Sequence, residues 1–256
     1  MRYAKYLIIF VLLFIGNIAL SGDSVFLVEE EDIVPNPLQV GEKLTYSIRW
    51  KKLPAGKRTD WIVKEEIVNG KDTYHIQSEM KTRALFRVYN FQNQQETYFN
   101  PITLSPVRFQ NRVKDRGFRA TVKTEFREGK AEYERISRPK SKAPQKREAK
   151  VLEIPPGTQD ELSLIYFLRS KQFVLGETYF FPLLVKGKVL KATLTVERKE
   201  FVKNKKLGNV RTIVLRTSEG GRFWITDDER RLPVKIETES KIGAIKANLT
   251  EIEIAN

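Results

Sequence analysis

The chain has 256 residues, with 46 lysines and arginines against 32 acidic residues and a formal net charge of +14 at pH 7. It contains no cysteine and a single histidine, which excludes disulfides, lipid attachment through cysteine, and zinc sites built from histidine and cysteine. The length fits one domain with its own core, and the positive charge predicts attraction to polyanions.

The first 21 residues have the pattern of a secretory signal peptide. Arg2 and Lys5 precede an apolar stretch from residue 6 to 15, and the small residues Ala19 and Ser21 precede an expected cleavage site. The alternative is an uncleaved anchor over residues 6–20, although a membrane span needs roughly 20 apolar residues. We expect cleavage, a periplasmic location and a mature charge of +12, because 44 basic residues remain against 32 acids.

Alternating apolar and polar residues predict antiparallel strands along much of the chain. Residues 44–50, 118–126 and 190–196 each place apolar side chains on one face and polar side chains on the other. The phase changes between Leu249 and Ile252, which predicts a β-bulge near Thr250. The predicted fold class is mainly β, with curved antiparallel sheets forming a sandwich, roll or open barrel.

Residues 22–256 read as one all-β domain with two similar halves, about 38–137 and 158–256. Each half opens a strand with Gly-Glu, contains a tight-turn glycine and later carries a Pro-Val pair. These marks stand at Gly41, Gly70 and Pro106 in the first half and at Gly176, Gly187 and Pro233 in the second. An internal duplication explains the recurrence, and chance is the open alternative.

Several large aromatic residues stand where strict alternation would place polar ones. They face a second apolar environment, which is either more core or a ligand cavity between curved sheets. The candidate ligand-binding residues are Tyr89, Phe91, Tyr98, Tyr179, Phe181 and Trp224.

Residues 138–150 are rich in lysine and arginine and contain neither aromatic nor β-branched side chains. We expect a basic loop that joins the two halves, because such a segment buries little apolar surface. It is either a solvated linker or a contact for anionic surfaces. The candidate contact residues are Lys140, Lys142, Lys146, Arg147 and Lys150.

One amphipathic helix is predicted near residues 159–170. Thr158 and Glu161 have the spacing of a capping box, and Leu162, Ile165 and Tyr166 follow at helical spacing. In a β protein this helix is expected to cover a sheet face or plug an open end.

The sequence offers little chemistry. Asp227 and Asp228 could act as paired carboxylates or calcium ligands, but the adjacent Arg230 and Arg231 favour a salt-bridged hairpin turn. His75 alternates with apolar neighbours and is expected at the surface of a strand. No nucleophile, phosphate-loop or dinucleotide motif is present, so we expect no catalytic residues, no metal and no cofactor.

Three ordered motifs resemble the family called domain of unknown function 3108, which consists of exported bacterial proteins. The motifs comprise residues 41–46 with Trp50, residues 159–163 with Tyr166 and Arg169, and residues 224–234 followed by Ile242-Gly243. The hairpin at 224–234 is also similar to one in periplasmic lipoprotein carriers of the LolA and LolB kind. That second resemblance implies a curved sheet that holds acyl chains.

The sequence therefore favours a non-enzymatic envelope protein that binds an apolar or amphipathic partner beside a basic rim. Lipid, a lipoprotein or an anionic envelope polymer are the expected partners, with peripheral membrane contact and no nucleic acid. The alternative is a structural or assembly factor that pairs with another envelope protein through a sheet edge. A hydrolase using the carboxylates near Asp227 ranks last.

Overall fold

The computed structural model describes residues 36–51, 53–82, 91–140, 144–218, 220–238 and 244–255. The expected signal peptide and Tyr89 lie outside the described residues. Within the described residues, α1 is Ser163–Arg169, and no helix is long and apolar enough to cross a membrane.

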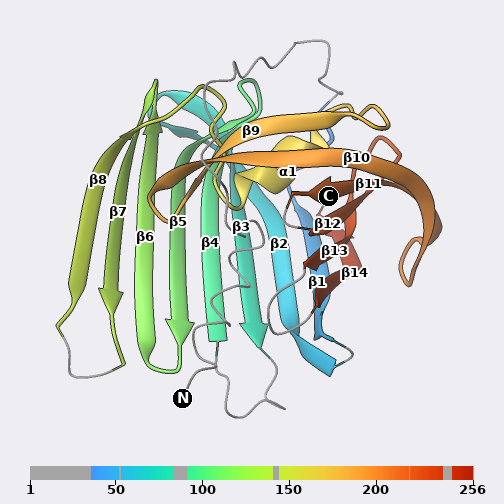
Figure 1. Ribbon diagram of the computed structural model, residues 1–256, viewed down its shortest axis with the longest axis horizontal. Helices are drawn as coiled ribbons and strands as arrows, with labels where there is room; N and C mark the ends of the chain where they lie inside the picture. Colours follow the sequence, from blue (N-terminus) through green and yellow to red (C-terminus); the bar gives the residue numbers. More distant parts are fainter. Residues whose placement is uncertain are drawn as a thin grey trace.

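Among the described residues, all the strands belong to one antiparallel sheet of 14 strands, drawn in Figure 1. Its order is β8-β7-β6-β5-β4-β3-β2-β1-β14-β13-β12-β11-β10-β9, so the chain forms two meanders that meet where β1 pairs with β14. The strands are β1 (Glu42–Trp50), β2 (Leu53–Val68), β3 (Lys71–Thr82), β4 (Phe91–Asn100), β5 (Ser105–Asp115), β6 (Phe118–Arg127), β7 (Lys130–Arg138), β8 (Lys146–Glu153), β9 (Thr178–Val185), β10 (Lys188–Asn204), β11 (Gly208–Thr217), β12 (Arg222–Thr226), β13 (Pro233–Thr238) and β14 (Ile245–Ile254).

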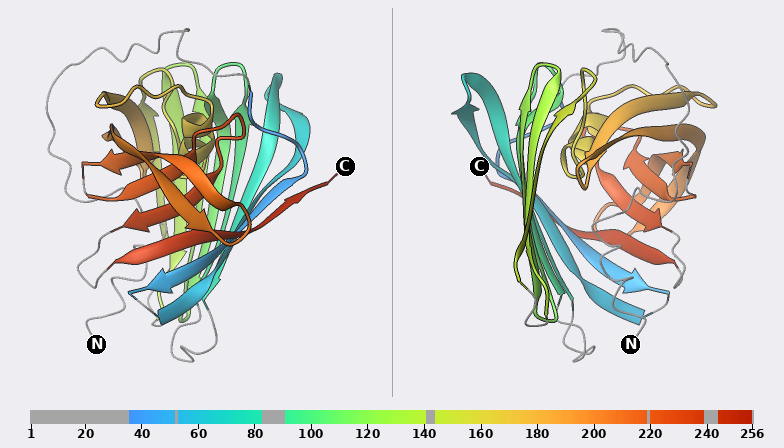
Figure 2. Two further views of the ribbon diagram at one scale, coloured as in Figure 1. Left: turned by 90° about the vertical axis from the view of Figure 1, so that its right-hand side faces the viewer. Right: turned by 60° about the vertical axis from the view of Figure 1, so that its left-hand side comes forward.

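The sheet is rolled but not closed. Figure 2 shows β9 and β10 facing the wall of green strands, with the helix between them, while β8 and β9 remain the two ends of the strand order. The open-barrel form of the predicted fold class is therefore confirmed. A sandwich of two separate sheets is wrong, because β1 and β14 join both meanders through backbone hydrogen bonds.

The alternating patterns form strands as predicted. Leu44, Tyr46 and Ile48 of β1 are buried in the core, because successive strand residues point to opposite faces of the sheet. The predicted bulge is confirmed at Thr250: Thr45 pairs with Glu251 and Tyr46 with Leu249, so Thr250 has no partner in this register.

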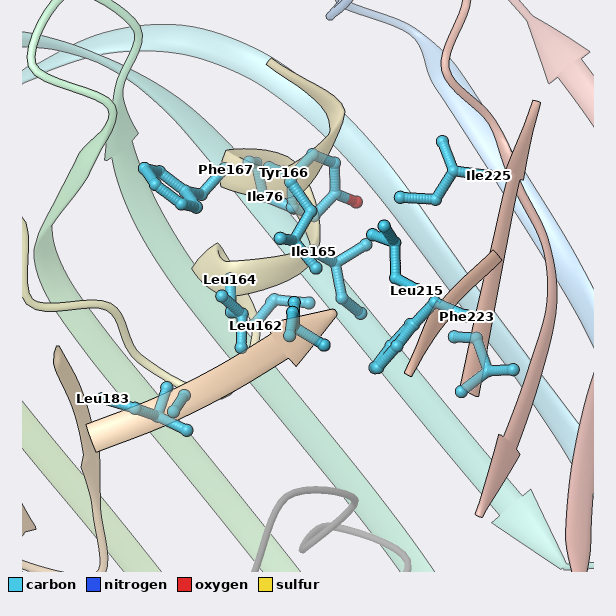
Figure 3. Packing of buried hydrophobic residues seen from close by; sticks show 14 of the residues in the cluster. Ile76, Leu162, Leu164, Ile165, Tyr166, Phe167, Leu183, Leu215, Phe223 and Ile225 are labelled. Carbon is cyan, nitrogen blue, oxygen red and sulfur yellow. The ribbon is translucent and has the colours of Figure 1, made fainter. Parts of the chain in front are cut away.

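The helix differs from its prediction in length and in character. It covers seven residues, and all of them are buried, so it is not amphipathic. Figure 3 shows Leu162, Ile165 and Tyr166 packed among side chains from strands on both sides. A helix enclosed by a rolled sheet meets apolar neighbours on every side, which removes the need for a polar face.

The predicted cap on Thr158 is also wrong. Its hydroxyl donates to the carbonyl of Pro155 at 2.6 Å. The Asp160 carboxylate instead accepts hydrogen bonds from the N–H groups of Leu162 and Ser163, at 2.7 and 2.8 Å. The Ser163 hydroxyl accepts in return from the N–H of Asp160, so the polar groups that begin the first turn satisfy one another.

The prediction of a basic loop at residues 138–150 is wrong for its second half. Residues 146–153 form β8, which pairs with β7 from Ser137↔Lys146 to Lys130↔Glu153. A segment with little apolar content can still be a strand at an edge, because β7 supplies its hydrogen bonds and the charged side chains remain in water.

The division into two similar halves stays a prediction. Pro106 and Pro233 each lie at the start of the fifth strand of their meander, β5 and β13. The turn glycines do not correspond, because Gly70 joins the second strand to the third and Gly187 joins the first to the second.

Candidate functional site

The three motifs noted in the sequence meet at Arg169. Its guanidinium, which is fully buried, donates to both carboxylate oxygens of Glu42, at 2.6 and 2.8 Å. It also donates to the backbone carbonyl of Arg230 at 3.1 Å. One residue from each motif thus belongs to a single buried network. The three motifs are therefore explained by contacts that hold the fold together.

The five aromatic candidates among the described residues do not line one cavity, and Tyr89 lies outside them. Phe91 and Phe181 lie in the hydrophobic core, where Phe181 meets Phe167 edge to face with ring centroids 5.5 Å apart. Tyr179 is half-buried and donates its hydroxyl to Glu177. Core packing therefore accounts for the inward-facing members of this set.

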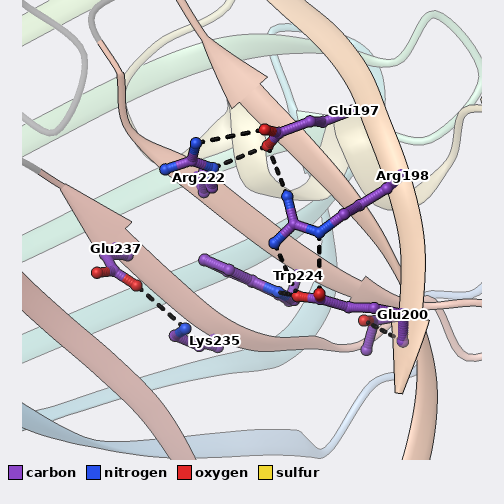
Figure 4. A network of polar contacts seen from close by, with 8 residues as sticks. Glu197, Arg198, Glu200, Arg222, Trp224, Lys235 and Glu237 are labelled. Atoms are coloured by element: carbon purple, nitrogen blue, oxygen red, sulfur yellow. Dashed lines mark hydrogen bonds and ion pairs between the residues drawn. The ribbon is translucent and has the colours of Figure 1, made fainter. Parts of the chain in front are cut away.

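Tyr98 and Trp224 lie on the outer face of the sheet. Tyr98 stacks on His75 at 4.6 Å between ring centroids, and this contact leaves His75 8% exposed, so its expected exposure is wrong. Trp224 donates its indole N–H to Glu200 and lies 3.7 Å from the ammonium of Lys235, within the network in Figure 4. Trp224 is buried and belongs to the hydrophobic core cluster, so packing and charged side chains enclose it and it lines no cavity among the described residues.

The four candidate anionic-contact residues that the structure describes do not share one face. Lys142 lies outside the described residues, and Lys140 is exposed beyond β7. The register with β7 places Lys146 and Lys150 on one face of β8 and Arg147 on the other. Arg147 pairs with Glu134 at 2.6 Å and Lys150 with Glu148 at 2.7 Å, so part of the charge is neutralised within the sheet.

The turn after β12 is salt-bridged as predicted. Asp228 pairs with Arg230 at 2.6 Å, while Asp227 pairs with Lys199 of β10 at 3.1 Å. Arg231 adopts a left-handed backbone conformation, with φ of 49°, which reverses the chain before β13. Across the part of the chain that the structure describes, no group of three or more metal-ligating side chains is present.

A pocket of about 80 Å³ lies where the turn between β9 and β10 approaches β5, β6 and β7. Because one water needs roughly 10–15 Å³, this space holds several waters or a small chemical group. Its walls combine an apolar side from the sheet with a polar end. The lining residues are Phe109, Asn111, Val113, Phe118, Ala120, Val122, Thr124, Tyr133, Arg135, Glu161, Leu184 and Lys186.

Ionisable groups from three separate segments meet at the polar end. Glu161 precedes the helix and accepts a hydrogen bond from Gln95 at 3.1 Å. Burial, and then the neighbouring Asp160 carboxylate, raise the pKa of Glu161 to about 8. Burial lowers the pKa of Lys186, and Arg135 acts in the same direction while Glu161 opposes it. At neutral pH Glu161 is therefore mostly protonated and can donate a hydrogen bond.

Two polar atoms at this pocket are buried without a partner. The Tyr133 hydroxyl and the side-chain oxygen of Asn111 have no hydrogen bond, although both residues are more than nine-tenths buried. Burying such groups unpaired costs about 1–3 kcal/mol each. Gly187 allows the turn to approach, since an added Cβ there would lie 2.8 Å from the Tyr133 ring. The pocket therefore presents hydrogen-bonding groups that the protein itself leaves unused.

One feature of the sequence could have indicated this pocket. Ala131, Tyr133 and Arg135 alternate along β7, so a cation shares the inward face with core residues. Glu161 has the spacing of a capping box in the sequence, and Lys186 stands beside the turn glycine Gly187. Only the fold brings these groups together, because they are far apart in the chain.

The rolled sheet defines a class: β proteins built from one open, barrel-like antiparallel sheet. The chain belongs to the family described as protein of unknown function (DUF3108), whose model matches residues 45–250. No curated protein matches its sequence.

Among solved structures, the chain is similar to a beta-barrel-like protein of domain of unknown function DUF1849 from Brucella abortus. The TM-score is 0.53 at 12% identity, covering 86% of this chain and 99% of that one. This likeness shows the fold alone. The likeness to lipoprotein carriers is not confirmed.

Proposed function

We propose that this protein works in the bacterial cell envelope as a non-enzymatic binding protein that holds an amphipathic ligand on the concave face of its sheet. The observation that carries the proposal is the pocket, which has an apolar wall and a polar end with unpartnered buried groups. Pockets of this composition are typical of ligand sites. The envelope location rests on the signal-peptide pattern of residues 1–21.

Binding is favoured over catalysis by what surrounds the pocket. Glu161 has a raised pKa, as general acids often do, but the described lining residues include no serine, cysteine or histidine to act with it. The carboxylates once considered for hydrolysis, Asp227 and Asp228, are paired with cations elsewhere.

The sheet edge supports the alternative of an assembly factor less well. β8 stands at one end of the strand order, so one of its sides is open to a further strand. Its sequence, KREAKVLE, places three cations and two acids on eight residues. Charged edge strands are a common device against pairing with other chains.

Native mass spectrometry of protein purified without detergent from its own envelope tests the proposal. Val122→Trp fills the pocket from β6, and Thr121→Trp puts the same ring on the opposite face as a matched control. We expect an added mass on the wild type and on Thr121→Trp, and its loss from a folded Val122→Trp. An added mass that Val122→Trp retains, or none on the wild type, would contradict the pocket as the binding site.

Export is tested separately by sequencing the N-terminus of the purified protein. Cleavage near Ser21 gives a mature chain that begins at Gly22. A chain that begins at Met1 and stays with the membrane after a carbonate wash would mean an anchored protein.

A further inference from the structure

We propose that the polar end of this pocket binds the anionic head group of a single-chain amphiphile, with Arg135 and Lys186 supplying charge and Tyr133 donating a hydrogen bond. This inference rests on the proposed function and names the chemistry of its ligand.

The two cations of the pocket form no salt bridge with an acid of the described residues. The acids on β7 and β8 pair with other cations, and the Glu161 carboxyl, which opposes the lowering of the Lys186 pKa, is itself mostly protonated. Glu134 pairs with Arg147, and Glu148 pairs with Lys150. Arg135 is half-buried and Lys186 is exposed, and both would attract an anion that enters the pocket.

The uncharged groups at the same end also suit an anion. The Tyr133 hydroxyl has no acceptor in the protein, and burial raises its pKa to about 12, so it stays protonated and able to donate. Glu161 donates as well while its pKa of about 8 keeps it protonated. The amide of Asn111 can turn its N–H groups inward, since its oxygen has no partner to hold it. Carboxylate or phosphate oxygens accept from all of these.

An apolar tail would lie against the sheet to one side of the polar groups. Asn111, Val122 and Arg135 form one row across β5, β6 and β7, and Val113, Ala120 and Phe118 lie next to that row. Their apolar surface favours a hydrocarbon chain by about 25 cal/mol for each Å² removed from water. Because the pocket itself holds only a small group, a head group in its polar end would leave most of the chain extending past these apolar side chains.

Titration calorimetry with four ligands of equal chain length separates head group from tail. Decanoate and decyl phosphate carry anionic heads, decanol a neutral one and decyltrimethylammonium a cationic one, each used below its micelle concentration. We expect both anions to bind at least 10-fold more tightly than decanol, and the cation to bind most weakly. The ratio of decanoate to decyl phosphate tells which anionic source the pocket prefers.

Lys186→Gln should weaken decanoate binding about 10-fold, a loss typical of one charge-assisted hydrogen bond. The matched control is Lys188→Gln, because Lys188 lies two residues further along, on β10, and does not line the pocket. Tyr133→Phe should weaken binding without lowering the midpoint of thermal unfolding, since the hydroxyl has no protein partner to lose. If the hydroxyl served stability alone, Tyr133→Phe would lower that midpoint and leave the affinity for decanoate unchanged.

Equal affinity for the anions and decanol would overturn the head-group inference and leave the proposed function standing. If none of the four ligands binds, the head-group inference is overturned as well. The proposed function is then decided independently by whether the native protein carries an added mass in native mass spectrometry. An equal loss of affinity in Lys186→Gln and Lys188→Gln would place the anion outside this pocket.

Discussion

Arg169, the last residue of the helix, and Glu42, the first residue of β1, form a bidentate ion pair inside the protein, 127 positions apart in sequence. The pair fixes the helix to the strand at which the two meanders join. Forked arginine–carboxylate pairs are specific in direction, so this contact also sets the orientation of the helix inside the roll.

Breaking this pair should destabilise the protein strongly. Glu42→Gln or Arg169→Met should lower the free energy of unfolding by about 3 to 5 kcal/mol, because either change leaves one buried group uncompensated. The double variant should cost less than the sum of the two. Lys43→Gln is the control, since it breaks the exposed pair with Glu253 and should cost less than about 1 kcal/mol. Urea denaturation gives all four values, and additive losses would contradict a coupled pair.

The buried helix should be sensitive to the loss of apolar volume. Leu162 is fully buried, so Leu162→Ala should cost about 2 to 5 kcal/mol. Val174→Ala, at a position that is 54% exposed, should change stability little. Chemical denaturation of both variants checks this, and similar small losses would mean that the helix contributes little to the core.

Stability should fall as pH rises, through Glu161. Its folded pKa of about 8 lies above its ordinary value of 4.5, so between these values the native state binds more protons than the unfolded chain. The free energy of unfolding should therefore decrease from about pH 5 to pH 8. Burial raises the pKa of Asp160 to about 6, so Asp160 adds to the decrease in stability below about pH 6. Glu161→Gln should reduce the decrease above about pH 6. If the free energy of unfolding of this variant depends on pH as the wild type's does, the assignment of the effect to Glu161 is contradicted.

The turn after β12 should depend on Asp228 for stability. Asp228 accepts hydrogen bonds from the Thr226 hydroxyl and from Arg230, and Thr226 in turn accepts from the N–H of Leu232. Asp228→Ala should cost about 1 kcal/mol, whereas Glu229→Ala, at an exposed position, should be nearly neutral. Replacing Asp227, Asp228 and Glu229 together should lower stability further. An unchanged denaturation midpoint combined with a lost cellular phenotype would instead point to a chemical site.

The charges of β8 should keep the open edge from pairing. Changing Lys146, Arg147 and Lys150 to threonine should produce dimers or larger species at high concentration, because an uncharged edge can accept another strand. Lys114, Arg119 and Lys123 lie on the inner strands β5 and β6, so the same changes there serve as the control. Sedimentation velocity over a concentration series measures the difference. Monomers in both variants would mean that another feature protects the edge.

The sequence alone determined the elements that depend on local pattern. Alternation at 44–50 and 118–126 produced β1 and β6, the phase change near Thr250 produced the bulge, and the charges after Trp224 produced a salt-bridged turn. Each of these is decided by neighbours in the chain, because side-chain direction in a strand repeats every two residues.

The tertiary structure decided what depends on distant partners. Residues 146–153 became a strand because β7 offered a free edge, and the helix became short and buried because the sheet rolled around it. The candidate pocket likewise exists only where β7, the segment before the helix and the β9–β10 turn come together. Burial changes what a side chain can do: Glu161 reads as an ordinary helix-start acid in the sequence, and the enclosed pocket keeps it protonated near neutral pH.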